Sequence, residues 1–190
     1  MSPASVVEHV VLFRIKDGAD PAAVASWLEG LRSLAALEFT HALHCRYRTA
    51  ADLAVYATHP AHLEVVRDFG AGICESLVAV DWVAELDTAT EVGLRPSAAV
   101  RVTLARLREG AAAAERTEVA AALREAGASS RGVEQVTGGE NFSPARADGF
   151  AVASLWAFPS SEELPMLEVE GSSGRRAWSP SISSSLPCPR

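Results

Sequence analysis

The sequence has few cysteines, few aromatic residues and almost no lysine. Three of its 190 residues are cysteines, and 6% are aromatic. Cys45, Cys74 and Cys188 lie far apart and form no CxxC pair, so neither a zinc ribbon nor a redox motif is indicated. Cys45 and Cys74 fall in apolar stretches, which favours buried free thiols over a disulfide, as in a reducing compartment.

Basic residues and long apolar runs are also scarce. Lys16 is the only lysine, the arginines are scattered, and the net charge is −7, with a pI of about 5.2. An acidic surface without a basic stripe argues against nucleic acid as a partner. No apolar run is long enough to span a membrane, and the first five residues are too few for a secretory signal. We therefore expect a soluble, cytoplasmic protein, with an organellar location as the alternative, and with neither nucleic acid nor membrane as a partner.

The strand predicted over residues 6–16 is apolar on both faces. One face of this strand carries His9 among apolar residues such as Val7, and the opposite face carries Val10 and Leu12. A strand of this kind is covered on both sides, so we expect helices over one face and a second sheet over the other.

The first half of the chain alternates strands and helices. In order, the pattern predicts a strand, a helix, a strand, two short helices and a strand, over residues 6–16, 20–37, 39–47, 49–56, 60–69 and 76–86. Thr49 and Asp52 form a capping box at the start of the first short helix. Pro60 breaks or restarts this helix, after which Leu63 and Val66 continue a helical face.

The second half repeats the beginning of this pattern about ninety residues later. After a linker at 87–98, we expect a strand, a helix ended by Gly127, a short strand, a loop, a strand and a helix start, over residues 99–108, 115–126, 133–137, 138–149, 150–158 and 160–164. The Ser- and Pro-rich tail predicts disorder. The predicted division is a first domain, a linker, a truncated second domain and a disordered tail, over residues 5–88, 89–98, 99–167 and 168–190.

Most of the candidate chemistry lies in residues 56–62, which read YATHPAH. Tyr56 and His62 place a phenol and an imidazole in one turn region, and His9 adds an imidazole from the first strand. Neutral imidazole and phenol together can move a proton near neutral pH. The same residues can equally be a core in which a few polar groups are held by hydrogen bonds. Residue pattern alone leaves both interpretations open.

The remaining histidines have simpler interpretations. His59, before a proline, is expected to cap a helix end. His41 and His44 lie on opposite faces of one strand, so they cannot enter one cavity together. No histidine pair has metal-binding spacing on a helix, so we expect no metal.

Two further polar positions are predicted to be structural. Asp81 lies within a strand, where a carboxylate needs a donor nearby. Asn141 is expected to form a turn. Gly138 and Gly139 lack the context of a nucleotide site, so no cofactor is expected.

Taken together, five segments resemble the stress-responsive A/B barrel (Dabb) family, in the order seen in plant members with two such domains in tandem. They are VEHVVLF at 7–13, FTHALHCRY at 39–47, YATHPAH at 56–62, VDWVA at 80–84 and GENFSPAR at 139–146.

The resemblance implies an α+β fold of tandem ferredoxin-like α/β-barrel units, each β-α-β-β-α-β, with antiparallel sheets and helices on one face. Two units pair through their sheets, either within one chain or in a homodimer. Here the first half lacks an edge strand, and the second lacks most of its second helix and its last strand.

The family includes stress-induced proteins of undefined activity and a plant polyketide cyclase that works without cofactor by intramolecular aldol condensation. The catalytic tyrosine and histidine of that cyclase match Tyr56 and His62, and a further active-site histidine matches His9. Two hypotheses follow from the resemblance. The protein binds an apolar small molecule or a like subunit without catalysis, or it is a cyclase in which His62 removes a proton and Tyr56 holds the oxyanion.

Overall fold

The structure is a computed structural model, and it describes residues 4–19, 34–35, 41–86, 93–95, 98–164 and 181–182. Most of the predicted helix over 20–37, of the linker and of the tail lies outside these residues, as does Cys188. The helix prediction is wrong at its end, because Leu34–Ala35 form a short strand, β2, that pairs antiparallel with β8 (Ser181–Ile182). Ser181–Ile182 are the described residues of the tail, and the prediction that residues 168–190 are disordered stays a prediction.

The first sheet consists of three antiparallel strands in the order β3-β1-β4. Its strands are β1 (Ala4–Ile15), β3 (His41–Tyr47) and β4 (Cys74–Leu86). β1 is the central strand, with Glu8 opposite both Arg46 and Trp82 and with His9 opposite Asp81. The strands predicted from the alternating pattern are therefore confirmed, to within a few residues at their ends.

Short helices follow β3, as the capping signals predict. They are α2 (Ala50–Thr58), α3 (Pro60–Val65), the π-helical turn η1 (Val66–Gly70) and α4 (Ala71–Ile73). Thr49 and Asp52 form the predicted capping box, and Pro60 restarts the helix after His59. Leu63 and Val66 lie on helical turns, but they are 52% and 45% exposed, so the apolar helical face that they suggest is not buried.

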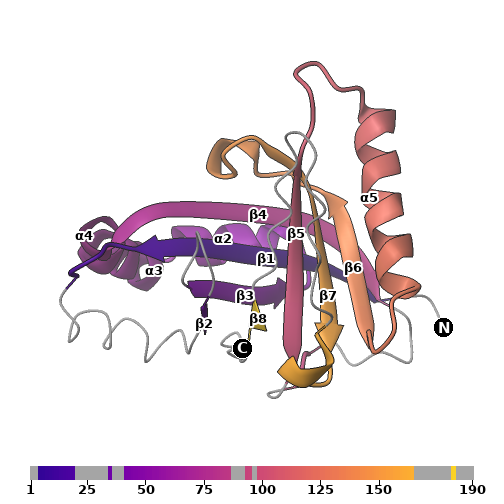
Figure 1. Cartoon of the computed structure of the whole chain (residues 1–190). Coiled ribbons are helices and arrows are strands. Elements are labelled where there is room, and N and C mark those ends of the chain that lie inside the picture. The colour runs from indigo at the N-terminus through magenta and orange to yellow at the C-terminus, as the bar shows by residue number, and fades with distance from the viewer. Residues whose placement is uncertain are drawn as a thin grey trace.

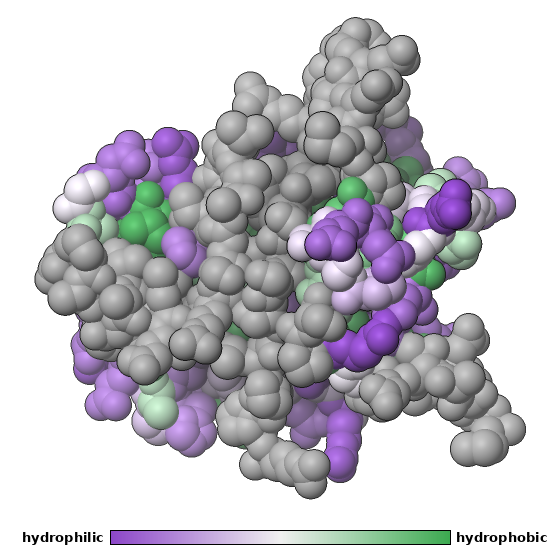
Figure 2. Space-filling model, turned by 60° about the horizontal axis from the view of Figure 1, so that its bottom comes forward, coloured by the Kyte–Doolittle hydropathy of each residue, from purple (hydrophilic) through white to green (hydrophobic). Residues whose placement is uncertain are grey.

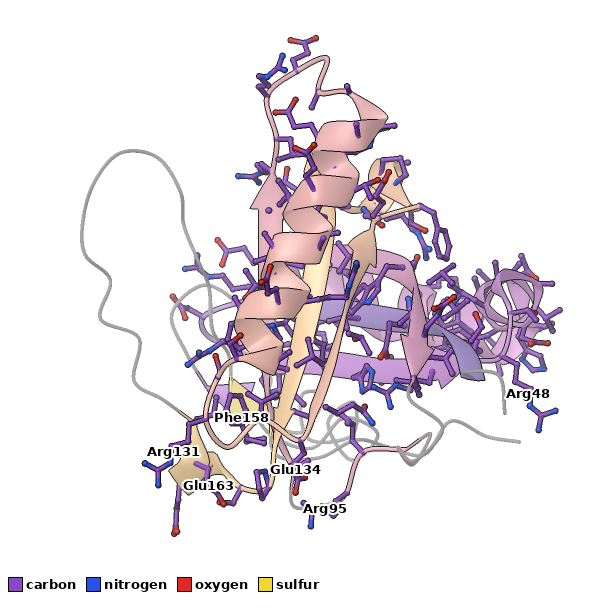
Figure 3. All side chains as sticks on the ribbon, turned by 90° about the vertical axis from the view of Figure 1, so that its right-hand side faces the viewer. Arg48, Arg95, Arg131, Glu134, Phe158 and Glu163 are labelled. Atoms are coloured by element: carbon purple, nitrogen blue, oxygen red, sulfur yellow. The ribbon has the colours of Figure 1, made fainter. Side chains whose placement is uncertain are left out.

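The second sheet also has three antiparallel strands, in the order β5-β7-β6. It comprises β5 (Ala99–Arg106), β6 (Gln135–Glu140) and β7 (Phe150–Phe158), with η2 (Pro144–Arg146) between β6 and β7 and η3 (Ser161–Glu163) after β7. α5 (Ala113–Ala128) connects β5 to β6, and Figure 3 shows this helix lying over the sheet.

Glycine misled two of the sequence predictions in this half. Gly127 does not end the helix but lies within α5, where a Cβ atom would approach the indole nitrogen of Trp156 to 2.7 Å. Gly138 and Gly139 belong to β6 and not to the predicted loop. A Cβ atom on Gly139 would lie 3.1 Å from Trp82 Cβ. Gly127 and Gly139 therefore allow close approach of neighbouring elements rather than a turn.

The two sheets pack face to face and bury one core between them. The core draws residues from five strands, among them Val10, Trp82, Val102 and Leu155. Strands of the second sheet run across those of the first (Figure 1). In particular, β6 passes over the first sheet from β3 to β4, since Gln135 accepts a hydrogen bond from Arg46 and Gly139 abuts Trp82.

The opposite face of the first sheet packs against the helices. Val11 and Phe13 of β1 form one apolar cluster with Ile73 of α4, and Val7 of β1 forms another with Leu53 of α2. Both faces of β1 are thus covered, by helices on one side and a sheet on the other. This confirms the prediction made from the two-sided apolar pattern of residues 6–16.

The visible surface is mixed in character. On the face that Figure 2 presents, hydrophilic side chains make up much of the coloured surface, and hydrophobic ones form separate small groups. In the part of the chain that the structure describes, no helix is both long and apolar enough to cross a membrane.

Candidate functional site

Four aromatic side chains meet on the helix-facing side of the first sheet. The ring centroids of Tyr56 and His62 are 4.5 Å apart, and those of His9 and Tyr56 are 6.1 Å apart. Tyr47 completes the group, at 5.5 Å from Tyr56 and 6.2 Å from His9. We call these four residues the ring cluster. β1, β3, α2 and α3 each contribute one member, so residues distant in sequence converge here.

The imidazole of His9 forms a hydrogen bond with a buried carboxylate. Its Nδ1 atom lies 2.5 Å from Oδ1 of Asp81, on the neighbouring strand β4. The side chains of His9 and Asp81 are only 4% and 0% exposed. An ionised carboxylate can only accept hydrogen bonds, so Nδ1 carries the proton and donates it to Asp81. In neutral His9, Nε2 is then the nitrogen with the free electron pair.

The turn between β6 and β7 of the second sheet forms hydrogen bonds with the side chain and the backbone of Asp81. Arg146 donates from Nη2 to the other carboxylate oxygen of Asp81 at 2.6 Å. The backbone N–H of Asp81 donates to the side-chain oxygen of Asn141, and the backbone N–H of Phe142 donates to the carbonyl oxygen of Asp81. The side chain of Asn141 also accepts from the N–H of Ser143, as its predicted turn role requires.

These contacts set the charge of Asp81. Burial alone would raise the pKa of the Asp81 carboxyl, but hydrogen bonds from His9 and Ser143 and the charges of His9 and Arg146 outweigh burial and lower this pKa. Asp81 is therefore ionised at neutral pH. The sequence prediction that this carboxylate needs a nearby donor is confirmed, since His9 and Arg146 contact its two oxygens.

His62 is suited to act as a base. Burial lowers its pKa, a hydrogen bond to the backbone of Ala57 works against this, and the charges of His9 and Arg146 lower the pKa further. Nδ1 of His62 lies 3.1 Å from the carbonyl oxygen of Ala57, so Nδ1 carries the proton and Nε2 has the free electron pair. A neutral imidazole beside the phenol of Tyr56 can accept a proton near neutral pH.

A second charged group lies on the other face of the same sheet, against the second sheet. His44 Nε2 and Arg46 Nη2 lie 2.6 Å and 2.7 Å from oxygens of Glu8, and all three side chains are at most 7% exposed. Burial acts to raise the pKa of Glu8, but His44 and Arg46 lower it to about 2. We call these three residues the Glu8 cluster. The ring cluster is separated from it by the sheet itself.

The structure brings together the three site residues proposed from the sequence. Tyr56, His62 and His9 all belong to the ring cluster, while their catalytic role stays a prediction. His59 lies outside it and caps α3, with Nδ1 accepting from the N–H of Ala61. His41 and His44 face opposite sides of β3, as their spacing predicts.

Sequence reasoning missed Arg146 and Tyr47 as members of the site and assigned Asp81 only a structural role. Tyr47 shares strand parity with Cys45 at the end of a predicted strand, which could have placed it beside His9. No local pattern links Arg146 to Asp81, because their pairing spans the two sheets. Among the residues that the structure describes, no group of three or more histidine, cysteine or acidic side chains could hold a metal ion.

The fold and this site define an α+β protein with two antiparallel sheets packed together and a buried histidine–carboxylate pair at the helix face. The model of the stress-responsive A/B barrel domain matches residues 35–84 and 99–166, more than half of the chain. The chain belongs to the stress-responsive A/B barrel family.

Two relatives from Arabidopsis thaliana, both described as stress-response A/B barrel domain-containing proteins, extend this assignment. The chain is 35% identical to the first of them over 185 residues, covering 88% of this chain and 70% of that relative. It is 33% identical to the second over 187 residues, covering 87% of this chain and 86% of that relative.

One solved structure is also similar, a dimeric protein of unknown function with a ferredoxin-like fold from Bacteroides fragilis. It is 23% identical, and the match covers 40% of this chain and 94% of that one, with a TM-score of 0.34. At this score the similarity carries no argument about assembly or activity.

Proposed function

We propose that this stress-response A/B barrel protein binds a small apolar molecule with a carbonyl group at the ring cluster. The observation that carries the proposal is the convergence of His9, Tyr56 and His62 from three elements onto one side of the sheet. Ligand sites combine apolar walls with a few placed polar groups. Here Val7 and Leu53 are the apolar neighbours, and the phenol and imidazole groups are the hydrogen-bonding ones.

Binding of an apolar fluorescent probe, such as anilinonaphthalene sulfonate, tests this proposal. We expect saturable binding that weakens at least tenfold in Tyr56→Ala and in His62→Ala. His59→Asn is the matched control, because it changes a histidine of the same segment outside the cluster and keeps a side-chain acceptor for Ala61. Equal binding by all four proteins would contradict the assignment of the site.

A second candidate function is cofactor-free cyclisation of a linear polyketide. The specific observation is the contact of His62 Nδ1 with the carbonyl oxygen of Ala57, with the ring of Tyr56 beside the imidazole. Because a carbonyl oxygen only accepts, this contact puts the proton on Nδ1 and leaves the electron pair on Nε2. In this reaction Nε2 would remove a proton from a carbon between two carbonyl groups, and Tyr56 would donate a hydrogen bond to the resulting enolate oxygen. The enolate carbon would then bond to a distant carbonyl carbon of the same chain, and loss of water would follow.

Incubation with a linear poly-β-keto acid distinguishes the two candidates. Formation of an aromatic acid that is lost in His62→Ala and in Tyr56→Phe would support cyclisation. Saturable probe binding without turnover would support binding alone. The His59→Asn control is expected to behave as the unchanged protein in both assays.

We also propose that the chain contains two A/B barrel units, over residues 5–88 and 99–167, that close on each other within one molecule. The strand orders support this, since β3-β1-β4 has the order of a ferredoxin-like sheet without its second strand, and β5-β7-β6 that of one without its fourth. The shared core between the sheets occupies the face through which separate subunits would otherwise pair.

Sedimentation of the full chain tests internal closure. We expect a monomer of 20.0 kDa across a wide range of concentration. The family resemblance also allows a homodimer. A stable homodimer would mean that a further surface mediates assembly, and it would contradict the proposal that the two units of one chain pair only with each other.

A further inference from the structure

The two arginines that pair with buried carboxylates differ in their access to solvent. Arg46 beside Glu8 is 7% exposed and lies between the sheets. Arg146 beside Asp81 is 44% exposed, although the side chain of Asp81 is fully buried. The guanidinium of Arg146 therefore covers a buried carboxylate and at the same time faces solvent, where another molecule can reach it.

Arg146 has hydrogen-bond donors that Asp81 does not use. A guanidinium carries N–H donors on Nε, Nη1 and Nη2. Nη2 of Arg146 donates to the Asp81 carboxylate at 2.6 Å and to the hydroxyl oxygen of Ser143 at 3.1 Å. Among the residues that the structure describes, none accepts a hydrogen bond from Nε or Nη1 of Arg146. The donors on these two nitrogen atoms are left for a bound group.

The same guanidinium lies next to the ring cluster. The Asp81 carboxylate joins the two, since one oxygen accepts from Arg146 and the other lies 2.5 Å from Nδ1 of His9. Burial lowers the pKa of His62, and the charges of His9 and Arg146 lower it further, so Arg146 is close enough to His62 to act on it. A molecule that lies on the rings of Tyr56 and His62 would therefore have the charged donors of Arg146 beside it.

We propose that Arg146 binds the carboxylate of an apolar organic acid whose apolar part lies on the ring cluster. The planar guanidinium matches the planar carboxylate, and hydrogen bonds between two charged groups are stronger than those between neutral groups. The whole chain has a net charge of −7, so an anionic ligand needs a local positive group of this kind. The inference rests on the proposed function and narrows its ligand, because the carbonyl group expected there becomes that of a carboxylate.

Two acidic side chains close to Arg146 in the fold or in the sequence are already paired. Asp148, two residues after Arg146, forms an exposed ion pair with Arg106. Asp81 is buried, with His9 on one oxygen and Arg146 on the other. One guanidinium can bridge two carboxylates, because its donors are spread around the plane of the group. Asp81 would thus fix the guanidinium, and Nε and Nη1 would bind the acid.

Binding of naphthoate and of the corresponding naphthamide, followed by their fluorescence, tests the inference. The two compounds share the apolar rings and a carbonyl group, but only naphthoate is charged at neutral pH. We expect the unchanged protein to bind naphthoate about tenfold more tightly or better. Arg146→Gln should bind both compounds equally, with unchanged affinity for the amide. Arg106→Gln is the matched control, since it removes an exposed arginine whose partner is Asp148, and it should keep the preference.

The outcomes separate this inference from the proposed function. Equal binding of both compounds by the unchanged protein would overturn the inference and leave the ring cluster as a binding site. A preference for naphthoate that survives in Arg146→Gln would do the same. Binding of neither compound would overturn the proposed site, and the inference with it.

Proton–nitrogen spectra of the arginine side chains cover the case in which Arg146→Gln does not fold. In the unchanged protein, we expect the Nε–H signal of Arg146 to shift as naphthoate is added, with the same saturation as the fluorescence, and to shift much less with naphthamide. The Nε–H signal of Arg106, which donates to the carbonyl oxygen of Asp148, should stay in place with both compounds. An unmoved Arg146 signal at saturating naphthoate would overturn the inference.

Discussion

Two buried carboxylates on opposite faces of the first sheet have similar partners but different surroundings. Glu8 contacts His44 and Arg46, and Asp81 contacts His9 and Arg146. The arginine beside Glu8 is 7% exposed and lies between the sheets, whereas the arginine beside Asp81 is 44% exposed. Of the two histidines, His9 beside Asp81 belongs to the ring cluster, and His44 does not.

The comparison shows that a carboxylate, an imidazole and a guanidinium can form a wholly buried group or one that borders a cluster of aromatic rings, according to what lies next to them. The side chains of the Glu8 cluster are buried, and the negative charge of Glu8 is compensated within the cluster by His44 and Arg46. His9, the histidine beside Asp81, contacts the rings of Tyr47 and Tyr56, and Tyr56 in turn contacts His62. This difference predicts stability effects for one face and functional effects for the other.

The largest expected effect is from Glu8→Gln. This change leaves the guanidinium of Arg46 buried without a counter-charge, and we expect the free energy of unfolding to fall by about 3–5 kcal/mol. Urea unfolding measures it. Probe binding per folded molecule should stay unchanged, because Glu8 lies on the face away from the ring cluster. A loss of binding without a loss of stability would reverse the roles assigned to the two faces.

Acid should act on the same carboxylate. The pKa of Glu8 is lowered from 4.5 to about 2 in the folded protein. A lowered pKa means that the contribution is fully present above the unfolded value and is lost as the pH falls through the folded one. The difference corresponds to about 3 kcal/mol at roughly 1.4 kcal/mol per pKa unit. Asp81, whose pKa is also lowered, adds a loss of the same sign.

Urea unfolding over a series of acidic pH values checks this expectation. The difference in unfolding free energy between the unchanged protein and Glu8→Gln should shrink as the pH falls from 4.5 toward 2. Parallel curves across this range would show that Glu8 is not the titrating group.

An intermediate effect is expected from Asp81→Asn. Arg146 can turn to solvent when it loses its partner, so we expect a loss of about 1–3 kcal/mol in the free energy of unfolding. Probe binding should fall more than tenfold, because the amide of asparagine has a single acceptor oxygen in place of the two that His9 and Arg146 contact in Asp81, so the ring of His9 is held less firmly. If Asp81→Asn bound the probe fully and lost as much unfolding free energy as Glu8→Gln, the two carboxylates would have the same structural role, and the contrast between the two faces would fail.

The smallest effect is expected from Arg95→Gln, at the rim of the second sheet. Figure 3 shows Arg95 beside Glu134, and the two form an ion pair with side chains 52% and 42% exposed. Exposed pairs of this kind contribute less than about 1 kcal/mol. If Arg95→Gln lowered the free energy of unfolding by more than this, loss of a charge would be enough for a large effect. Burial of the charge would then not explain why Glu8→Gln is expected to cost more than Arg95→Gln.

Local periodicity predicted much of the first half. The alternation in residues 6–16 identified a strand covered on both faces, and Thr49 with Asp52 marked the start of α2. The segment 56–62 and His9 drew attention to the residues of the ring cluster. These features depend on neighbours in sequence, and such neighbours are visible in a single chain.

Contacts between distant elements could not be predicted in the same way. The pair of Asp81 and Arg146 joins positions on different sheets, and nothing in either segment specifies the other. The sequence around Gly139 predicted a loop, but this glycine lies in β6. Its backbone passes so close to Trp82 that there is little space for a Cβ atom. The pairing of Leu34–Ala35 with Ser181–Ile182 likewise joins two segments that show no strand pattern.

The packing of both sheets within a single polypeptide also has a consequence for dilution. The chain from Leu86 to Ala99 links β4 directly to β5. Tethered surfaces of this kind meet at an effective concentration in the millimolar range, however scarce the protein is. A partnership between separate subunits would weaken at low abundance, whereas this molecule should keep its buried interface even when a cell makes only a few copies.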